Sequence, residues 1–512
     1  MMKNNTKALL CAGMLVTIMV LPGVGTAAQY NSSTDTNANV LDYLENNRRA
    51  ARENALTDEQ QQLVQDALEM SRNLRDPLDP TKNVPVALEG DELFYDQRNG
   101  DFYAVGQVNI TSMDAQRFKT EEIKGNLQNT EINVPGKGHM VQMTPQQAKI
   151  IMDGYRIQYN YGKKTGSMED VSGKIDHEYI KGKRIELYPD KILVFDGYIT
   201  KCSAVHPDYR TSAAMVEVYP GDKMICHDLK FWLGDTPIYS AKKKTFRLDR
   251  DDSQMDLPRV GYNPDDGWWI RKNFTKDLNK NLYLTGDVIY TGKHGFHSNG
   301  GLVYINSLGK FELLTGYYES SNNKWIKKAP SFRYSKSIPL GDSPFTVNLR
   351  YERGHWSQDN IHSMHTFYEA TLKHKPIDLG GNHKLDLSTS YSVTDESYNH
   401  SRIKGLGYAA LLWRDVDPRW SYYTRYSYTQ ANSKNSVFDY DLDSYSRKLS
   451  AGFSYKFNDH DRVVVGTAFN MNNYHLADMD LYWFHEFHCL QLISRYRVKR
   501  HQVNFTLQFN PW

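Results

Sequence analysis

His501-Gln-Val-Asn-Phe-Thr-Leu-Gln-Phe-Asn-Pro-Trp512 is the stretch that decides the fold. Apolar and polar side chains alternate strictly along it, with Val503, Phe505, Leu507 and Phe509 in one set and Asn504, Thr506, Gln508 and Asn510 in the other. A β-strand has a side-chain period of two, so it sends these sets to opposite faces. The same alternation recurs from Pro258 onward, punctuated by turn residues. This pattern predicts an antiparallel transmembrane β-barrel with lipid outside and water inside.

The segment Phe345–Glu352 illustrates the expected strands. Its outward set is Phe345, Val347, Leu349 and Tyr351, and its lumen set is Thr346, Asn348, Arg350 and Glu352. Since a tilted strand crosses a bilayer in about 9–11 residues, the region predicts roughly 14–18 strands. A soluble β-sandwich also alternates, but its sheets rarely contain so many strands.

The composition fits this expectation. A chain of 512 residues is expected to form at least two domains. A hydrophobic content of 40% and a mean hydropathy of -0.65, with no long apolar run beyond the N-terminus, argue against a helical membrane protein. The 35 Tyr and nine Trp residues are amphipathic aromatics, which gather at membrane interfaces.

Residues 1–28 have the pattern of a secretory signal. Lys3 and Lys7 precede an apolar core, and Thr26-Ala27-Ala28 offers a cleavage site of small residues. Removing the two lysines brings the formal net charge of +2 close to zero. Nothing in this charge balance indicates a nucleic-acid partner.

Residues 29–85 predict a polar, partly helical arm. Val40–Asn47 and Thr57–Met70 have helical spacing, and Thr57 followed by Gln60 fits a capping box. The favoured interpretation is a tether, and the alternative is a helix that docks on a partner.

Residues 86–248 contain repeated strand–turn–strand units. Ile185–Asp196 turns at Tyr-Pro-Asp, and Val216–Asp228 turns at Tyr-Pro-Gly-Asp. Units that cannot bury an apolar face alone must stack. The repeats therefore predict a β-solenoid or β-jelly roll, followed by a barrel over residues 249–512.

These units resemble a known family. Glu89-Gly-Asp-Glu-Leu-Phe-Tyr-Asp96 with Gly106-Gln-Val-Asn-Ile110 is similar to the opening of OstA/LptA-like periplasmic domains. Tyr198-Ile-Thr-Lys-Cys202, Val216-Glu-Val-Tyr-Pro-Gly-Asp222 and Leu233-Gly-Asp-Thr-Pro-Ile-Tyr-Ser240 resemble the LptD family of outer-membrane lipopolysaccharide-assembly proteins. The resemblance implies an N-terminal periplasmic jelly roll and a transmembrane barrel. The predicted barrel is much smaller than that family's, which is the main departure.

The resemblance implies that the jelly roll shields acyl chains. Burying apolar groups is worth about 0.8 kcal/mol per CH₂. The residues expected to line its interior are Leu93, Val108, Ile110, Ile157, Ile185, Leu187, Ile192, Val194, Val216, Val218, Met224, Phe231 and Leu233. The alternative is that these side chains only fill a closed core.

Cys202, Cys226 and Cys489 remain beyond the signal, and three thiols allow one disulfide in an oxidising compartment. The resemblance implies the pair Cys202–Cys489, and Cys202–Cys226 is the rival. A metal site at His485-Glu-Phe-His488-Cys489 is not expected, because His488 points to the other face of the strand. No cofactor is expected.

A lateral exit for lipid would need a weak seam in the barrel. Proline interrupts a hydrogen-bonded ladder, and Pro258, Pro264 and Pro330 lie in or near the early strands. We expect the seam between the strand near Pro258 and the C-terminal strand. The alternative is that these are ordinary turn or edge prolines.

The resemblance thus implies a non-enzymatic lipopolysaccharide translocon component in the outer membrane of a Gram-negative-type bacterium. It would receive lipopolysaccharide in the periplasmic jelly roll and insert it into the outer leaflet through the barrel. The expected partners are lipopolysaccharide, an LptE-like lipoprotein plug and an LptA-like periplasmic bridge protein, both implied by the resemblance. The main alternative is a passive porin with an accessory periplasmic domain, and a secreted structural β-protein is a third.

Overall fold

The computed structural model describes residues 38–73, 86–144, 148–176, 178–247, 258–319, 325–430, 437–438 and 446–509. These described residues form two α-helices, a short 3-10 helix (Val498–Arg500), an open antiparallel sheet and a closed barrel. The predicted signal segment and the predicted end of the arm at Asp76–Pro80 lie outside the described residues.

Two amphipathic helices form the N-terminal arm, α2 (Asn39–Asn54) and α3 (Asp58–Asn73). The predicted capping box is confirmed, because Gln60 Oε1 accepts a hydrogen bond from the Thr57 backbone N–H (2.9 Å) and Thr57 Oγ1 accepts one from Gln60 (3.3 Å). Neither helix, nor any other helical segment of the described ranges, is long and apolar enough to cross a bilayer.

The segment after the arm forms a twelve-stranded antiparallel sheet in which each strand from β3 on pairs with the next strand in the chain. We call it the folded sheet. Its strands are β1 (Val86–Glu89), β2 (Glu92–Tyr95), β3 (Asp101–Ser112), β4 (Gln116–Asn126), β5 (Glu131–Gln142), β6 (Ile150–Asn160), β7 (Thr165–Ile175), β8 (Glu178–Leu187), β9 (Ile192–Thr200), β10 (Tyr209–Tyr219), β11 (Lys223–Leu233) and β12 (Thr236–Arg247).

Strands of the folded sheet bend near their middles. The β3–β4 register shifts between Val105 and Val108, and Asp196 of β9 and Asp228 of β11 have positive φ angles of 46° and 52°. Such irregularities bend a strand and increase its twist. The bends let the sheet fold over on itself, and buried side chains from β3 to β11 form one continuous apolar core.

The rest of the chain forms a closed antiparallel barrel, in which the first strand pairs with the last. Its strands are β13 (Arg259–Asn263), β14 (Gly267–Asp277), β15 (Leu282–Thr291), β16 (Gly295–Asn306), β17 (Gly309–Glu319), β18 (Trp325–Pro339), β19 (Phe345–Gln358), β20 (Ile361–His374), β21 (Ile377–Gly380), β22 (His383–Glu396), β23 (Ser401–Asp415), β24 (Trp420–Thr429), β25 (Arg447–Lys456), β26 (Asp461–Asn470), β27 (His475–Glu486), β28 (Leu490–Arg497) and β29 (Gln502–Phe509).

Sixteen of these strands form the barrel wall. β20 pairs directly with β22, so the four-residue β21, which pairs only with β22, is a short addition at the rim. The count falls within the predicted range. The all-β fold with a closed antiparallel barrel is therefore confirmed.

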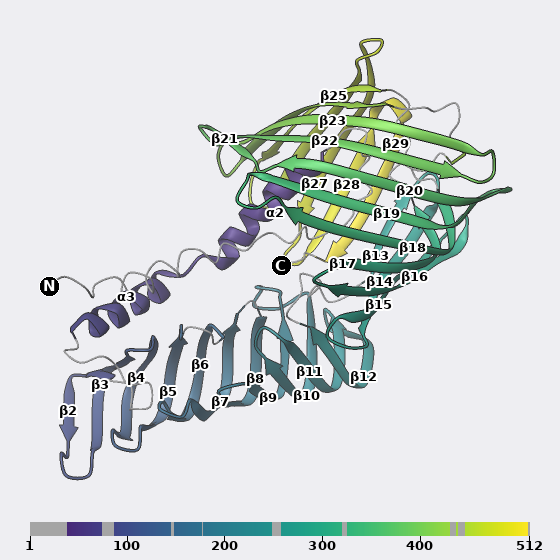
Figure 1. Ribbon diagram of the computed structural model, residues 1–512. Coiled ribbons are helices and arrows are strands. Elements are labelled where there is room, and N and C mark those ends of the chain that lie inside the picture. Colours follow the sequence, from purple (N-terminus) through teal and green to yellow (C-terminus); the bar gives the residue numbers. More distant parts are fainter. Residues whose placement is uncertain are drawn as a thin grey trace.

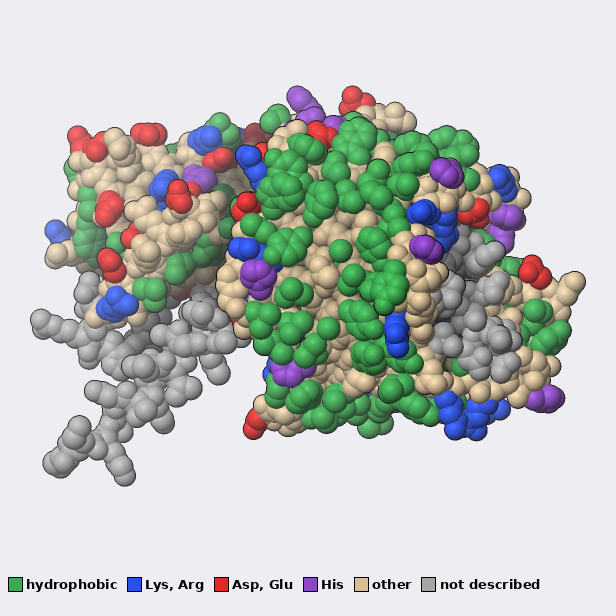
Figure 2. Space-filling model, turned by 90° about the horizontal axis from the view of Figure 1, so that it is seen from above, with side chains coloured by type: hydrophobic (Ala, Val, Ile, Leu, Met, Phe, Trp, Pro, Cys, Tyr) green, Lys and Arg blue, Asp and Glu red, His purple; other side chains and the backbone are tan. Residues whose placement is uncertain are grey.

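The barrel is apolar outside and polar inside. Trp268 and Phe296 are 70% and 72% exposed on the outer wall, and Figure 2 shows hydrophobic side chains spread over the barrel face seen there. In β29, Val503 and Phe505 are exposed, whereas Asn504 is buried toward the lumen, as the alternation predicts. This is the arrangement of a membrane-spanning barrel.

The folded sheet lies against one rim of the barrel, and the arm reaches both parts (Figure 1). We call this rim the sheet-side rim. The β27–β28 turn and the end of β29 lie at it, because Cys489 and Phe509 contact the folded sheet. Since strands alternate in direction, the connections β14–β15, β16–β17, β18–β19 and β23–β24 lie there too. β24 ends at Thr429 and β25 begins at Arg447, both at the opposite rim.

Candidate functional site at the junction of the folded sheet and the barrel

Ten of the residues predicted to line the jelly-roll interior lie in the folded-sheet core. They are at most 4% exposed and pack against one another: Val108, Ile110, Ile157, Ile185, Leu187, Ile192, Val194, Val216, Val218 and Met224. The strand alternation therefore assigned their inward direction well. In this conformation they fill a closed core, which is the alternative left open by the sequence.

Three of the predicted lining residues lie elsewhere. Leu93 is 49% exposed because β2 pairs only with the first half of β3 and presents all its side chains to solvent. Leu233 ends β11 and is 40% exposed beside the barrel. Phe231 is buried in a separate cluster at the junction. The alternation of apolar and polar residues predicts the face of the strand on which a side chain lies, but it does not predict where along the folded sheet the apolar core ends.

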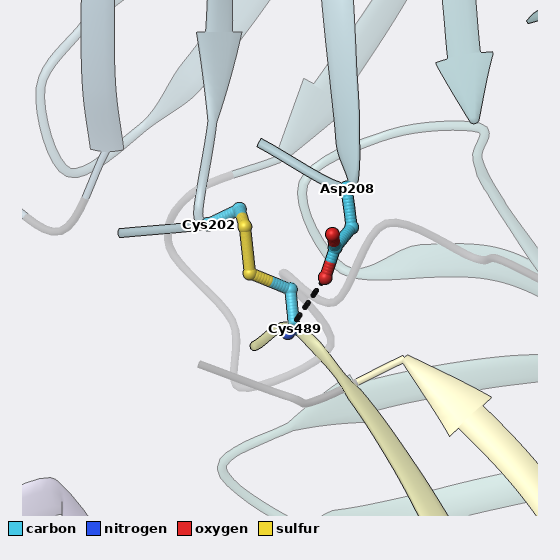
Figure 3. Close-up of side chains that lie close together, drawn as sticks. All are labelled: Cys202, Asp208 and Cys489. Carbon is cyan, nitrogen blue, oxygen red and sulfur yellow. Dashed lines mark hydrogen bonds between the residues drawn. A yellow bond between two sulfur atoms is a disulfide. The ribbon is translucent and has the colours of Figure 1, made fainter. Parts of the chain in front are cut away.

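A disulfide between Cys202 and Cys489 joins the folded sheet to the sheet-side rim (Figure 3). This is the pair implied by the resemblance. The rival partner, Cys226, is a free thiol that is fully buried in the folded-sheet core. Burial raises the pKa of Cys226 to about 12, so this thiol is held neutral and away from exchange.

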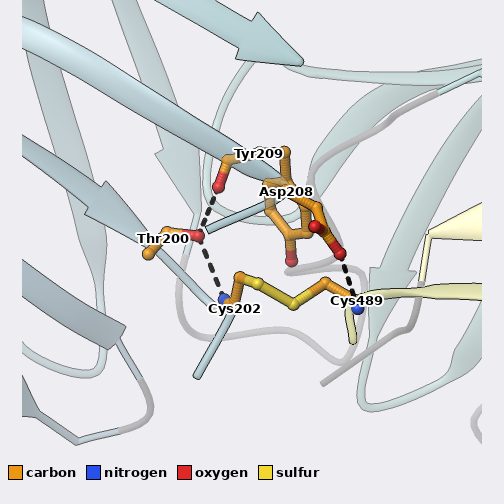
Figure 4. Close-up of a disulfide and its surroundings, with 5 residues drawn as sticks. All are labelled: Thr200, Cys202, Asp208, Tyr209 and Cys489. Atoms are coloured by element: carbon orange, nitrogen blue, oxygen red, sulfur yellow. Dashed lines mark hydrogen bonds between the residues drawn. A yellow bond between two sulfur atoms is a disulfide. The ribbon is translucent and has the colours of Figure 1, made fainter. Parts of the chain in front are cut away.

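Hydrogen bonds fix the two backbones that carry the disulfide (Figure 4). Thr200 Oγ1 accepts from the Cys202 backbone N–H (3.0 Å) and donates to the Tyr209 carbonyl oxygen (2.6 Å). The Asp208 carboxylate accepts from the Cys489 backbone N–H (3.1 Å). The link is therefore part of an ordered junction.

Aromatic rings complete the junction. Tyr209 lies edge-on to Phe509, with 5.4 Å between ring centroids, and Phe231 lies 6.5 Å from Phe509. Burial raises the pKa of Tyr209. Phe509 belongs to the stretch that predicted the barrel, so the last barrel strand also anchors the folded sheet.

The acidic and sulfur atoms at the junction do not form a metal site in this oxidised state. Ligand-type atoms of Cys202, Asp208 and Cys489 lie within 4.8 Å of one another. The two sulfur atoms are bonded to each other, so they offer no thiolate. His485 is instead paired with the Asp461 carboxylate at 2.8 Å.

An apolar cavity of about 480 Å³ opens beside the disulfide. It is lined by Asp208, Leu233 and Gly234 of the folded sheet and by Phe487, His488 and Leu490 of the barrel. The cavity therefore lies between the folded sheet and the sheet-side rim of the barrel.

The barrel seam lies between β13 and β29. Only three positions pair there, Val260–Leu507, Gly261–Thr506 and Tyr262–Phe505, whereas β19 and β20 pair at fourteen. A Cβ atom on Gly261 would lie 2.4 Å from the Phe505 carbonyl oxygen, so the close approach requires glycine. Among the described wall strands this is the shortest pairing.

Two of the three predicted seam prolines flank β13. Pro258 directly precedes the strand, and Pro264 lies in the turn that follows it. Pro330 lies in β18 at a register shift between Lys328 and Ser331, away from the seam. Pro258 and Pro264 are therefore strand-end and turn prolines, whereas Pro330 lies at a bulge inside a strand.

The lumen contains ionic networks. Glu352, which the alternation placed inside, is fully buried and accepts hydrogen bonds from Lys328 (2.6 Å) and Arg333 (2.9 Å). On another part of the wall, Arg495 donates to Asp480 (2.8 Å). A charged lumen favours polar and ionic solutes over apolar ones.

Helix α2 lies within the barrel, which the sequence did not reveal. Ala38 and Leu41 pack against the lumen-facing Tyr423, Val464 and Phe484. The buried face of the helix also carries Asp42, Glu45 and Arg49. A search for an apolar helix face misses such a contact, and the available signal was the spacing of these charges on one face.

No family model and no curated protein matches this sequence. Solved structures that it resembles are OmpF of Salmonella typhi in complex with daunomycin (12% identity, 49% of this chain, 94% of that chain, TM-score 0.30) and the outer membrane channel DcaP of Acinetobacter baumannii (13%, 49%, 94%, 0.31). The KdgM porin is similar at 9% identity, over 49% of this chain and 97% of that chain, with a TM-score of 0.20. These low values carry no inference about function, and none of the three findings is specific to the LptD family.

Proposed function

We propose that this chain is an outer-membrane channel with an accessory domain on the periplasmic side. The observation that carries the proposal is the closed sixteen-stranded barrel with an apolar exterior and a charged lumen. In outer-membrane barrels the short turns face the periplasm and the longer loops face outward. Connections at both rims are mostly short, but the long separation in sequence between Thr429 and Arg447 joins strands at the rim opposite the folded sheet, so the folded sheet would lie in the periplasm.

The barrel could carry either small polar solutes or lipopolysaccharide, and its polar interior fits small polar solutes better. The inner face of the wall carries charges of both signs, which are buried in ion pairs around Glu352 and Asp480 and make the barrel interior polar. This porin function needs no apolar path and assigns the folded sheet an accessory role. It accounts for the barrel without any further assumption.

The second candidate is transport of lipopolysaccharide, and the junction favours it. The folded sheet is tied by Cys202–Cys489 to the rim, an apolar cavity adjoins the disulfide, and the barrel seam is short. Acyl chains would pass along the sheet and leave through the seam, while the sugar portion would use the polar lumen. The partners would be an LptA-like bridge protein at the free β1–β2 end and an LptE-like plug.

Photo-crosslinking in cells distinguishes the two candidates. A photoreactive residue replaces Leu233, which lines the junction cavity, and the matched control replaces Tyr155 of β6, which is similarly exposed at 46%. Lipopolysaccharide adducts at position 233 and not at 155 would support lipid transport. Ion conductance without adducts would support the porin.

Depletion of the protein gives the complementary result. For lipid transport, newly made lipopolysaccharide should fail to reach the cell surface. For a porin, its surface delivery should continue while uptake of small polar solutes falls.

A further inference from the structure

The inference concerns helix α2 and its contacts with strands β23 to β27 of the barrel wall. Its apolar anchor is Leu41, which is fully buried against Tyr423, Val464 and Phe484. Leu411 and Trp413 of β23 complete the surrounding patch. These wall residues come from β23, β24, β26 and β27, and all of them alternate with lipid-facing neighbours.

Ion pairs match the helix to the wall along its length. Asp42 accepts a hydrogen bond from Arg462 at 2.7 Å, and Glu45 lies 4.0 Å from Lys456. One helical turn later the signs reverse. Arg48 pairs with Asp415 and Arg49 pairs with Glu486, both at the sheet-side rim.

This reversal fixes the direction of the helix. The acidic half of α2 faces the basic residues Arg462 and Lys456 beside the β25–β26 turn. Its basic half faces the acidic residues Asp415 and Glu486 at the ends of β23 and β27, so both sets of partners lie toward the sheet-side rim. The opposite direction would bring like charges together. The Arg462 guanidinium also lies 3.8 Å from the Phe484 ring centroid, which holds it in place for Asp42.

The next helix ties the same arm to the folded sheet. Leu63 of α3 is fully buried against Ala115 and Val141, and Asp66 pairs with Arg117. The arm therefore has one helix on each part of the molecule. If α2 left the barrel, α3 would keep it close enough to return.

We propose that α2 is a plug built into the chain, and that its seating on the β23–β28 wall controls the width of the lumen. This inference rests on the proposed channel function, and it adds that helix α2 regulates the opening of that channel. It places inside this chain a role that the sequence resemblance assigned to a separate lipoprotein.

The ion pairs between α2 and the barrel wall are suited to a plug that can leave the lumen. Paired charges in a protein interior give up hydration, so releasing both partners to water changes the free energy little. Removing one partner while the helix stays seated leaves the other charge uncompensated, which is unfavourable. The ion pairs thus select the seated direction without making it permanent.

Conductance of the purified full chain in planar lipid bilayers tests the plug. Asp42→Arg places two cations together on the wall, and we expect the ratio of closed to open channels to fall about tenfold. The control is Asn47→Arg, which adds a positive charge on the exposed face of α2 and should conduct like the unsubstituted chain. Asp42→Arg combined with Arg462→Asp restores the pair and should restore the closed state.

A crosslink provides the second measurement. Asp42→Cys with Arg462→Cys, joined by a bifunctional thiol crosslinker that contains a reducible disulfide, should stay closed until a reductant is added, because the linker spans the distance that the native Arg462 side chain covers. The unsubstituted chain under the same crosslinker and reductant is the control. Heat-modifiable mobility in gel electrophoresis verifies that each variant forms the barrel.

The outcomes separate the two proposals. If the unsubstituted chain, Asp42→Arg and the crosslinked variant all conduct equally, the channel stands and the plug is wrong. If the folded variants never conduct in any state, the channel proposal fails and the plug fails with it. Opening by Asp42→Arg with closure by the charge swap supports both.

Discussion

At the scale of single residues, the junction depends on two side chains that are 287 positions apart in the sequence. Cys202 and Cys489 close this long loop, and Asp208 and Thr200 hold their backbones. A cross-link between distant positions stabilises a fold mainly by restricting the unfolded chain. The third thiol is buried among apolar side chains and takes no part.

Cys489→Ser should weaken the attachment of the folded sheet to the barrel. We expect a loss of about 2–5 kcal/mol in the free energy of unfolding, from the lost chain restriction. Denaturant unfolding in detergent measures it, with Cys226→Ala as the control that retains the disulfide. Equal stability of Cys489→Ser and the unsubstituted chain would show that the disulfide carries no part of the junction.

A second residue-scale expectation concerns acid. Partial burial raises the pKa of Glu59 on α3, but hydrogen bonds from Lys119 and His139 outweigh it and lower that pKa below its usual value. A lowered folded-state pKa stabilises the docked helix above the unfolded value of about 4.3, and this contribution is lost as pH falls through the lowered pKa.

Fluorescence anisotropy of a dye on Gln62→Cys therefore should fall between pH 5 and strongly acidic conditions as α3 detaches. Glu59→Gln should show a smaller acid-dependent change, because its contribution is absent at every pH. An acid response of the same size in both proteins would mean that other carboxylates hold the helix.

At the scale of elements, the barrel strands and the arm differ in how well the sequence predicted them. Lipid and water lie on opposite faces of each barrel strand, so apolar and polar residues must alternate along it. This alternation allowed the sequence to predict β19 and β29 as barrel strands. The place of α2 could not be read, because its buried face carries charges whose partners lie far away in the chain, Arg462 being 420 positions from Asp42.

The bends of the folded sheet and the limits of its core were equally hidden. Positive φ angles at Asp196 and Asp228 depend on the packing of neighbouring strands, and non-glycine side chains give no local sign of them. At the candidate site, the disulfide partner came from a family resemblance, since spacing alone left Cys226 as a rival.

The short seam predicts a site-specific block of lipid exit. Val260→Cys with Leu507→Cys joins β13 to β29 at paired positions and should stop surface delivery of lipopolysaccharide if that is the cargo. The matched control joins β14 to β15 through Ile270→Cys and Tyr290→Cys, which are also paired and outward-facing.

Delivery is measured by surface labelling of lipopolysaccharide in cells that carry only the variant. The control pair should leave delivery intact. Unchanged delivery with a complete β13–β29 cross-link would rule out this seam as the exit.

At the scale of the whole molecule, one physical division organises the chain. The barrel exterior meets lipid, its lumen meets water and α2, and the folded sheet keeps its apolar face closed against itself. The disulfide, the aromatic junction and the arm join these parts at one rim. Channel function, cargo and plugging all require that the barrel wall has lipid on one side.

Spin labels placed one at a time at positions 503 to 508 of β29 test that requirement most directly in reconstituted lipid bilayers. Collision with oxygen, which concentrates in lipid, should be high at positions 503, 505 and 507 and low at 504, 506 and 508, whose native side chains face the lumen. Equal oxygen accessibility at all six positions, or a protein that stays monodisperse in water without detergent, would contradict the membrane barrel.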